Sequence, residues 1–155
     1  MKTEECSESG NIRTLLVPPG PCDLCTHARI MALLSVTDRS AEYAQVIVLN
    51  SGVRGPFLAP DSRAWVDVVS SAMTMRWQER TVTGAMFSNM VMPHVQSYFL
   101  SFPIASLGVV LPIYAATCAG NKERCTFNGE LKLWSKLVDA RFAVYSLGQD
   151  ALFRN

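Results

Sequence analysis

Two cysteines with two residues between them, Cys22 and Cys25, have the spacing that most clearly permits chemistry. A C-x2-C turn lets two sulfurs converge and supplies two corners of a tetrahedral zinc site. Cys118 and Cys125 would supply the other two corners, although their separation is wider than usual. The default interpretation is packed thiols, because cysteine is often buried as a small hydrophobic residue. We therefore expect no cofactor, with zinc as the candidate metal.

The same cysteines permit redox chemistry. A redox-active C-x2-C pair needs a helix directly after it, and residues 28–36 are an apolar run of strand length, which argues against this role. Cys118 and Cys125 enclose a polar stretch typical of a hairpin loop, and a disulfide could bridge that loop. The chain has five cysteines, an odd number that fits free thiols better than a complete disulfide framework. Reduced cysteines are therefore the expected state.

No catalytic residue is predicted. The chain contains two histidines, His27 and His94, and no G-x-S-x-G nucleophile motif. It also lacks both glycine-rich motifs that bind nucleotide phosphates. His94 follows a proline in an apolar stretch, and we interpret it as a core or interface histidine. We expect a protein without enzymatic activity.

Composition favours a domain with much buried surface. Of the 155 residues, 49% are hydrophobic and 17% are charged, and the net charge of +1 attracts neither nucleic acid nor an anionic membrane. The candidates for a surface facing nucleic acid are four scattered cations, Arg76, Arg80, Lys122 and Arg124. The tryptophans are interpreted as core or interface anchors rather than base-stacking platforms: Trp65, Trp77 and Trp134.

The first eleven residues, 1–11, are acidic, and we expect them to be mobile. They lack the basic flank of a secretory or mitochondrial signal, so a cytoplasmic location is expected unless the protein belongs to a virion. The most apolar stretch, residues 98–119, contains two prolines, so we expect no membrane-spanning helix.

Short apolar runs separated by proline and glycine predict about eight strands. We expect strands at 12–17, 28–36, 42–49, 64–77, 80–87, 107–117 and 141–147. Two stretches, 90–102 and 131–147, stay open between strand and helix, and within the second we favour the strand at 141–147. Together these elements predict an all-β fold over residues 12–155, a single β-sandwich with at most one or two short helices.

Residues 63–93 carry a resemblance to a known family. The positions that match are Arg63, Val68, Val69, Ser70, Thr83, Gly84 and Pro93. The passage resembles the single-jelly-roll capsid proteins of small icosahedral viruses, in which a long strand crosses the sandwich, turns and returns as its neighbour. The resemblance implies an eight-stranded jelly roll that assembles with copies of itself into a virus coat. It implies nucleic acid as a second partner, although the basic N-terminal arm of many such proteins is missing here.

The leading hypothesis is therefore a structural protein that self-assembles into a shell. Low charge and many apolar positions are compatible with a surface buried against copies of the same chain. The alternative hypothesis is a zinc-stabilised, β-rich interaction module with Cys22 and Cys25 as ligands. Neither hypothesis places the protein at a membrane.

Overall fold

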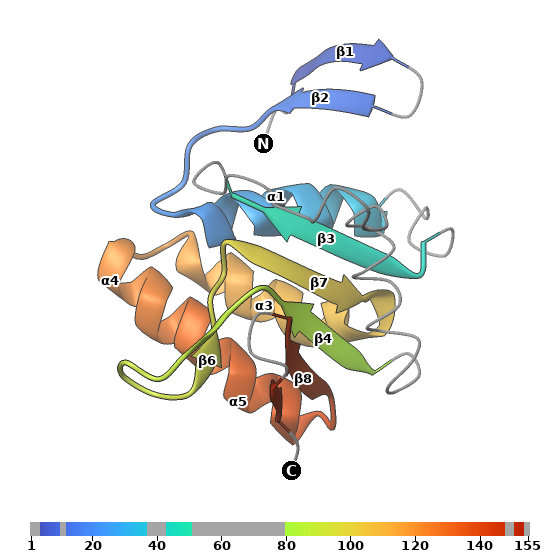
Figure 1. Ribbon diagram of the computed structural model, residues 1–155. Helices are drawn as coiled ribbons and strands as arrows, with labels where there is room; N and C mark the ends of the chain where they lie inside the picture. The colour runs from blue at the N-terminus through green and yellow to red at the C-terminus, as the bar shows by residue number, and fades with distance from the viewer. Residues whose placement is uncertain (1–3, 10–11, 37–42, 51–79, 148–150, 154–155) are drawn as a thin grey trace, which may run out of the picture.

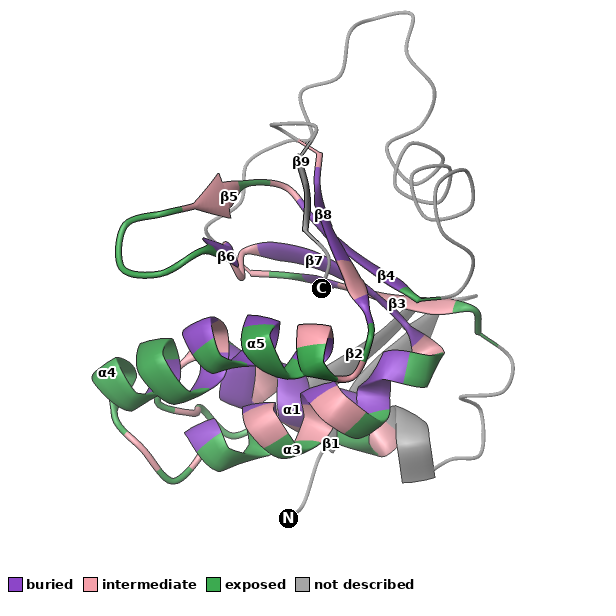
Figure 2. Ribbon diagram, turned by 90° about the horizontal axis from the view of Figure 1, so that it is seen from below, coloured by how far each residue is buried: buried purple, intermediate pink, exposed green. Residues whose placement is uncertain are grey.

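A computed structural model describes residues 4–9, 12–36, 43–50, 80–147 and 151–153. Figure 1 shows a sheet with helices behind it, and Figure 2 shows the two layers edge-on. The strands are β1 (Glu4–Ser9), β2 (Ile12–Leu16), β3 (Gln45–Leu49), β4 (Thr81–Gly84), β5 (Phe87–Ser88), β6 (His94–Val95), β7 (Phe99–Pro103), β8 (Ala143–Ser146) and β9 (Ala151–Phe153). The helices are α1 (Asp23–Val36), η2 (Ile104–Ser106), α3 (Leu107–Thr117), α4 (Lys122–Arg124), η3 (Cys125–Leu131) and α5 (Lys132–Asp139).

Five strands form the main sheet, in the order β3-β7-β4-β8-β9. β7 pairs antiparallel with β3 and β4, whereas β4 and β8 are parallel, so the chain crosses over between them through the helix layer. Two further hairpins lie outside the main sheet, β1 with β2 and β5 with β6. The fold is mixed α/β, and the predicted all-β sandwich with eight jelly-roll strands is wrong.

The core lies between the sheet and the helices. One face of the sheet contributes alternate residues, such as Val82 on β4 and Leu100 and Phe102 on β7, because side chains of a strand alternate between faces. The helices contribute the other half of this cluster, including Met31 of α1 and Tyr114 of α3. α3 packs against both α1 and α5 and therefore lies between them.

The central strand β4 is buried on its other face as well. All four residues of β4 are buried, as expected for a central strand covered on both sides. Thr81 and Thr83 point away from the helix-side residue Val82, and their hydroxyls have no hydrogen-bond partner among the described residues. Uncharged side chains therefore line both faces of this strand.

Two segments predicted as strands are helices. Residues 28–36 lie within α1, and residues 107–117 coincide with α3. Both runs are apolar without a clear period, and such a run fits a buried strand and a buried helix equally well. Pro112 lies inside α3 at a position that is exposed together with Gly108, four residues earlier, so the helix accepts it on its outer side.

Other sequence-based predictions are confirmed. The strands expected at 12–17, 42–49 and 141–147 correspond to β2, β3 and β8, and the strand expected at 80–87 contains β4. Residues 1–11 contain β1, which pairs with β2, and the expected mobility of this segment stays a prediction. Of the two open stretches, 90–102 contains β6 and most of β7, and the second is helical over 131–137. The strand expected at 64–77 lies outside the described residues.

No helix within the described ranges has both the length and the hydropathy needed to cross a membrane.

Candidate functional site

Four cysteines meet at one corner of the helix layer. Cys22 is bonded to Cys125 and Cys25 to Cys118, in two disulfides that span 103 and 93 residues. The expectation that these four thiols are reduced is wrong, and the alternative of a bridge between Cys118 and Cys125 is wrong as well. The reason is the local structure: α3 ends just before Cys118, α4 lies between the two cysteines, and η3 begins at Cys125, so the segment is helical rather than a hairpin and both sulfurs bond to cysteines at the start of α1.

A tight turn at the start of α1 presents Cys22 and Cys25. The Cys25 amide donates to the Cys22 carbonyl at 3.2 Å, so the chain bends within the C-x2-C sequence. Gly20 lies against this turn, since a Cβ there would be only 2.7 Å from the Cys25 sulfur. The Arg29 guanidinium donates to the carbonyl oxygens of Pro18 and Pro19 and holds the preceding loop against the helix.

The opposite half of the corner comes from α4 and η3. The Asn121 side chain caps α4 by accepting from the Arg124 amide at 3.0 Å. η3 is a π-helix that passes close to α1 and α3, and a Cβ at Gly129 would lie 2.6 Å from Leu24 and 2.7 Å from Thr117. A side chain at this position would therefore push against α1 and α3, and glycine lets η3 pack closely on both helices.

In the part of the chain that the structure describes, no group of three or more histidine, cysteine, aspartate or glutamate side chains could hold a metal ion. Cys22, Cys25, Cys118 and Cys125 are consumed by the disulfides. The expectation of no cofactor stays a prediction. The strand expected after Cys25 was the reason for rejecting a redox pair. That strand is wrong, because Cys25 lies in the helix α1.

A second feature is the hairpin formed by β5 and β6, whose tip projects from the molecule and is coloured as exposed in Figure 2. Four large apolar side chains are exposed along it: Met86 by 47%, Met90 by 90%, Val91 by 68% and Met92 by 44%. We call these four residues the hairpin surface. Exposed apolar patches of this kind mark interaction sites, and methionine adapts to the shape of its partner.

A cleft of about 280 Å³ lies beside the hairpin surface. It is lined by residues of the hairpin, η3, α5 and β8: Phe87, Met92, Pro93, His94, Val95, Leu131, Trp134, Ser135, Val138 and Val144. His94 donates from Nδ1 to the Met92 carbonyl at 2.8 Å, which fixes the ring against the hairpin. The hairpin is anchored to η3 by the Ser97 amide, which donates to the Glu130 carboxylate at 2.8 Å.

The hairpin surface, and the residues of the hairpin that line the cleft, belong to a long segment without charge. From Thr81 to Asn121 the sequence contains no aspartate, glutamate, lysine or arginine. α3 lies within it, and the exposed positions of that helix fall on one stripe of small residues, Gly108, Pro112, Ala115 and Ala116. A helix without charges all round is normally covered, so this outer stripe is unusual for a face in contact with water.

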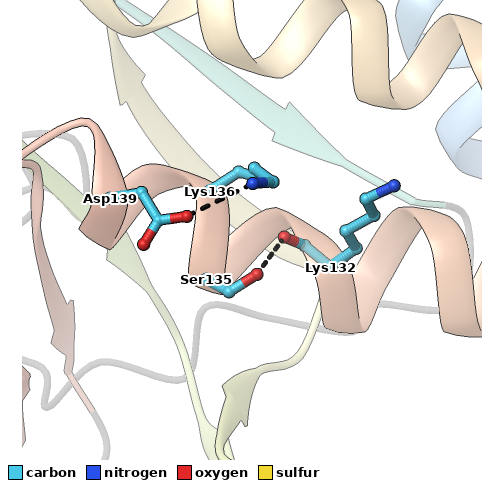
Figure 3. Close-up of polar contacts among 4 residues, drawn as sticks. All are labelled: Lys132, Ser135, Lys136 and Asp139. Carbon is cyan, nitrogen blue, oxygen red and sulfur yellow. Dashed lines mark hydrogen bonds and ion pairs between the residues drawn. The ribbon is translucent and has the colours of Figure 1, made fainter.

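α5 has the charged outer face that α3 lacks. Figure 3 shows Lys136 paired with Asp139 at 3.3 Å, and the Ser135 hydroxyl donating to the Lys132 carbonyl at 3.0 Å. Both contacts lie on the exposed side of the helix and contribute little to stability. The contrast between α5 and α3 shows that charge is absent from one part of the helix layer only.

Arg80, one of the four cations considered for nucleic acid, is engaged within the protein. It lies 4.5 Å above the Phe142 ring and donates to the carbonyl oxygens of Ala140 and Arg141 at the end of α5. Arg141 has a φ of 63°, the left-handed conformation common after a helix end. Arg80 thus closes the turn between α5 and β8.

Of the remaining predicted residues, the structure describes Lys122, Arg124 and Trp134. Lys122 and Arg124 are exposed on α4, and Arg76 lies outside the described residues. Trp134 of α5 is buried in the hydrophobic core between the helices and the sheet. Trp65 and Trp77 lie outside the described ranges. The structure therefore brings together the four cysteines, whereas Arg80 lies at the end of α5 and Lys122 and Arg124 lie on α4.

Sequence reasoning assigned no role to His27, which is buried in α1. Its Nε2 donates to the Leu49 carbonyl of β3 at 3.2 Å, and its Nδ1 has no partner within the described part of the chain. Burial lowers the pKa of His27 below 6.5, with the Leu49 carbonyl and the Asp23 carboxylate opposing that shift. This histidine ties α1 to the sheet as a neutral side chain.

No model of a known protein family matches the sequence, and no curated protein or solved structure matches the chain.

Proposed function

We propose that this chain is a non-enzymatic structural protein that self-associates through the hairpin surface and the adjoining cleft. The observation that carries the proposal is the exposure of Met90 and Val91 within the charge-free segment from Thr81 to Asn121. An exposed apolar surface costs free energy in water, and covering a methionine or valine side chain recovers about 1.5–3 kcal/mol. A partner is therefore favoured wherever its own surface is apolar and uncharged.

A second copy of the chain meets that requirement. An interface related by a two-fold axis needs projecting side chains and a hollow within the same patch, because each copy presents both. The hairpin provides this combination, since Met90 projects from its tip and Met92 lines the cleft beside it. The absence of charge removes the electrostatic repulsion that two identical charged patches would have.

The outer stripe of α3 supports association beyond a pair. It belongs to the same charge-free segment, and its small residues would allow close approach of another copy. Assembly into a shell stays a prediction, now without the jelly roll from which it was inferred. Nucleic acid as a second partner also stays a prediction. The two disulfides favour an oxidising compartment over the cytoplasm for the structure as it stands.

The experiment is a measurement of mass against concentration, by analytical ultracentrifugation of the disulfide-bonded protein. The test variant is Met90→Lys, which places a charge at the most exposed apolar position. Because each copy in a two-fold pair loses its buried methionine, association should weaken by at least about a hundredfold. The matched control is Tyr43→Lys, which adds the same charge at an exposed apolar residue beside β3, outside the charge-free segment.

The wild type and the Tyr43→Lys variant are expected to associate alike, and the Met90→Lys variant to remain a monomer at concentrations where they associate. Electron micrographs of the associated fraction distinguish closed particles from small oligomers. A wild-type protein that stays monomeric over the whole concentration range would refute self-association. Equal weakening by both substitutions would show that the hairpin is not the interface.

A further inference from the structure

We propose that the four cysteines at the corner of α1, when reduced, bind one zinc ion as a tetrathiolate. The proposal rests on the convergence of Cys22, Cys25, Cys118 and Cys125 and is independent of self-association. Four thiolates in one place form a soft, closed ligand set, and zinc is the metal that such sets select in structural sites.

The backbone already holds the four residues within reach of a single ion. The Cα atoms of the bonded pairs are 6.4 Å apart for Cys22 and Cys125 and 4.9 Å apart for Cys25 and Cys118. The pairs are also adjacent to each other, because the Cys25 amide donates to the Cys22 carbonyl at 3.2 Å and the Cys125 sulfur lies 3.9 Å from the carbonyl oxygen of Thr117, the residue before Cys118.

The change from disulfides to a zinc site is small. Sulfurs bonded to each other are about 2.05 Å apart, whereas sulfurs at two corners of a tetrahedron with Zn–S bonds of about 2.3 Å are roughly 3.8 Å apart. Each pair therefore has to separate by about 1.7 Å, a distance that rotation of the side chains can supply. Cys22 and Cys118 are half-buried, so an ion can enter from their side, while Cys25 and Cys125 form the buried floor.

The chemistry balances without an oxidant. In a reducing compartment the four thiols never form the disulfides, and binding one Zn²⁺ releases four protons and leaves a complex with a charge of −2. The N-terminal amides of α1 favour thiolates at Cys25, which lies in the first turn of that helix. Lys122 and Arg124 in the short helix before Cys125 offset part of the charge, while Glu123 between them and Asp23 in α1 oppose it.

The four cysteines join the start of α1 to the end of α3 and to η3. Disulfides would close this corner in an oxidising compartment, and zinc would close it in a reducing one. The same four side chains would thereby hold one structure in both settings.

The test uses the full-length chain, purified under strictly reducing conditions and given ZnCl₂ in the presence of a weak chelator. Zinc per chain is measured by mass spectrometry after desalting, together with the number of thiols that react with an alkylating reagent. Cys118→Ser and Cys125→Ser remove one ligand each, and Cys6→Ser is the matched control, because Cys6 in β1 is the one cysteine not in the corner.

One zinc per chain is expected in the wild type and in the Cys6→Ser variant, with four thiols protected. The Cys118→Ser and Cys125→Ser variants should bind zinc at least about a hundredfold more weakly. Circular dichroism covers the case in which the reduced chain unfolds, since zinc should then restore helical signal. A reduced wild type that takes up no zinc, folded or unfolded, would overturn the proposal, as would unchanged zinc content in both ligand variants.

Discussion

Removal of one disulfide should cost far less stability than removal of both, because one ring lies inside the other. Either disulfide alone closes a loop of roughly 100 residues, which stabilises the folded chain by about 4.7 kcal/mol through the unfolded state. The sequence separations of 103 and 93 residues differ by 10, so once the first bond exists the second closes a ring of only 10 residues. A ring of that size contributes about 2.7 kcal/mol.

We therefore expect a loss of about 2.7 kcal/mol when either pair is replaced by alanine, and about 7.4 kcal/mol when both are replaced. The double loss exceeds the sum of the single losses by about 2 kcal/mol, well beyond the usual error of additivity. A loss of that size would remove most of the stability of an ordinary domain, so the variant without disulfides should be largely unfolded at 25 °C.

The assay is urea unfolding of the two paired variants and of the variant that lacks both disulfides, each in a Cys6→Ser background to prevent exchange. Fluorescence and circular dichroism should give the same midpoints if unfolding is two-state. Losses that simply add, with each pair costing about 4.7 kcal/mol, would refute the argument from nested rings. Single losses near zero would show that the unfolded chain does not gain the expected freedom.

Two further predictions concern packing and pH. Gly84→Ala should destabilise the protein by about 1–3 kcal/mol, because the new Cβ would lie 2.2 Å from Val95 and 2.9 Å from Leu100. The control is Gly108→Ala, where nothing lies within 4 Å of the new Cβ, and this variant should not lower the melting temperature. An unchanged melting temperature for Gly84→Ala would contradict the close packing of the hairpin base on β4. For His27, burial lowers the pKa in the folded state, so the unfolded state binds more protons and stability should fall as pH drops below about 6.5. His27→Gln should flatten that slope in denaturation experiments from pH 7 to pH 5, and equal slopes in both proteins would assign it to another group.

Local patterns predicted the strands better than the helices. β3 and β8 are short, rich in β-branched and aromatic residues and bounded by breaks, and both were predicted close to their observed positions. α1 and α3 were predicted as strands, because their apolar residues surround the helix and leave no polar face to reveal a period of 3.6. The low charge of the chain therefore removed the signal that distinguishes a buried helix from a buried strand.

The cysteine corner was predictable in membership but not in pairing. The C-x2-C spacing marked Cys22 and Cys25, and the same reasoning grouped them with Cys118 and Cys125. Which sulfur meets which depends on the direction in which η3 leaves α4, and a π-helix has no clear sequence signature. The hairpin surface was missed because residues 90–102 stayed open between strand and helix, and only the fold shows that Met90 and Val91 face outwards.

Because β4 pairs with β8, the centre of the sheet can be completed only late in synthesis. β4 takes both of its partners from later parts of the chain, and the second one, β8, begins only at Ala143. Until the ribosome has delivered that residue, one side of β4 presents unpaired amide and carbonyl groups next to the uncharged segment from Thr81 to Asn121. Open strand edges beside apolar sequence invite wrong pairing between nascent chains. The stage at which nascent chains are most exposed to aggregation is thus the interval before β8 has been synthesised.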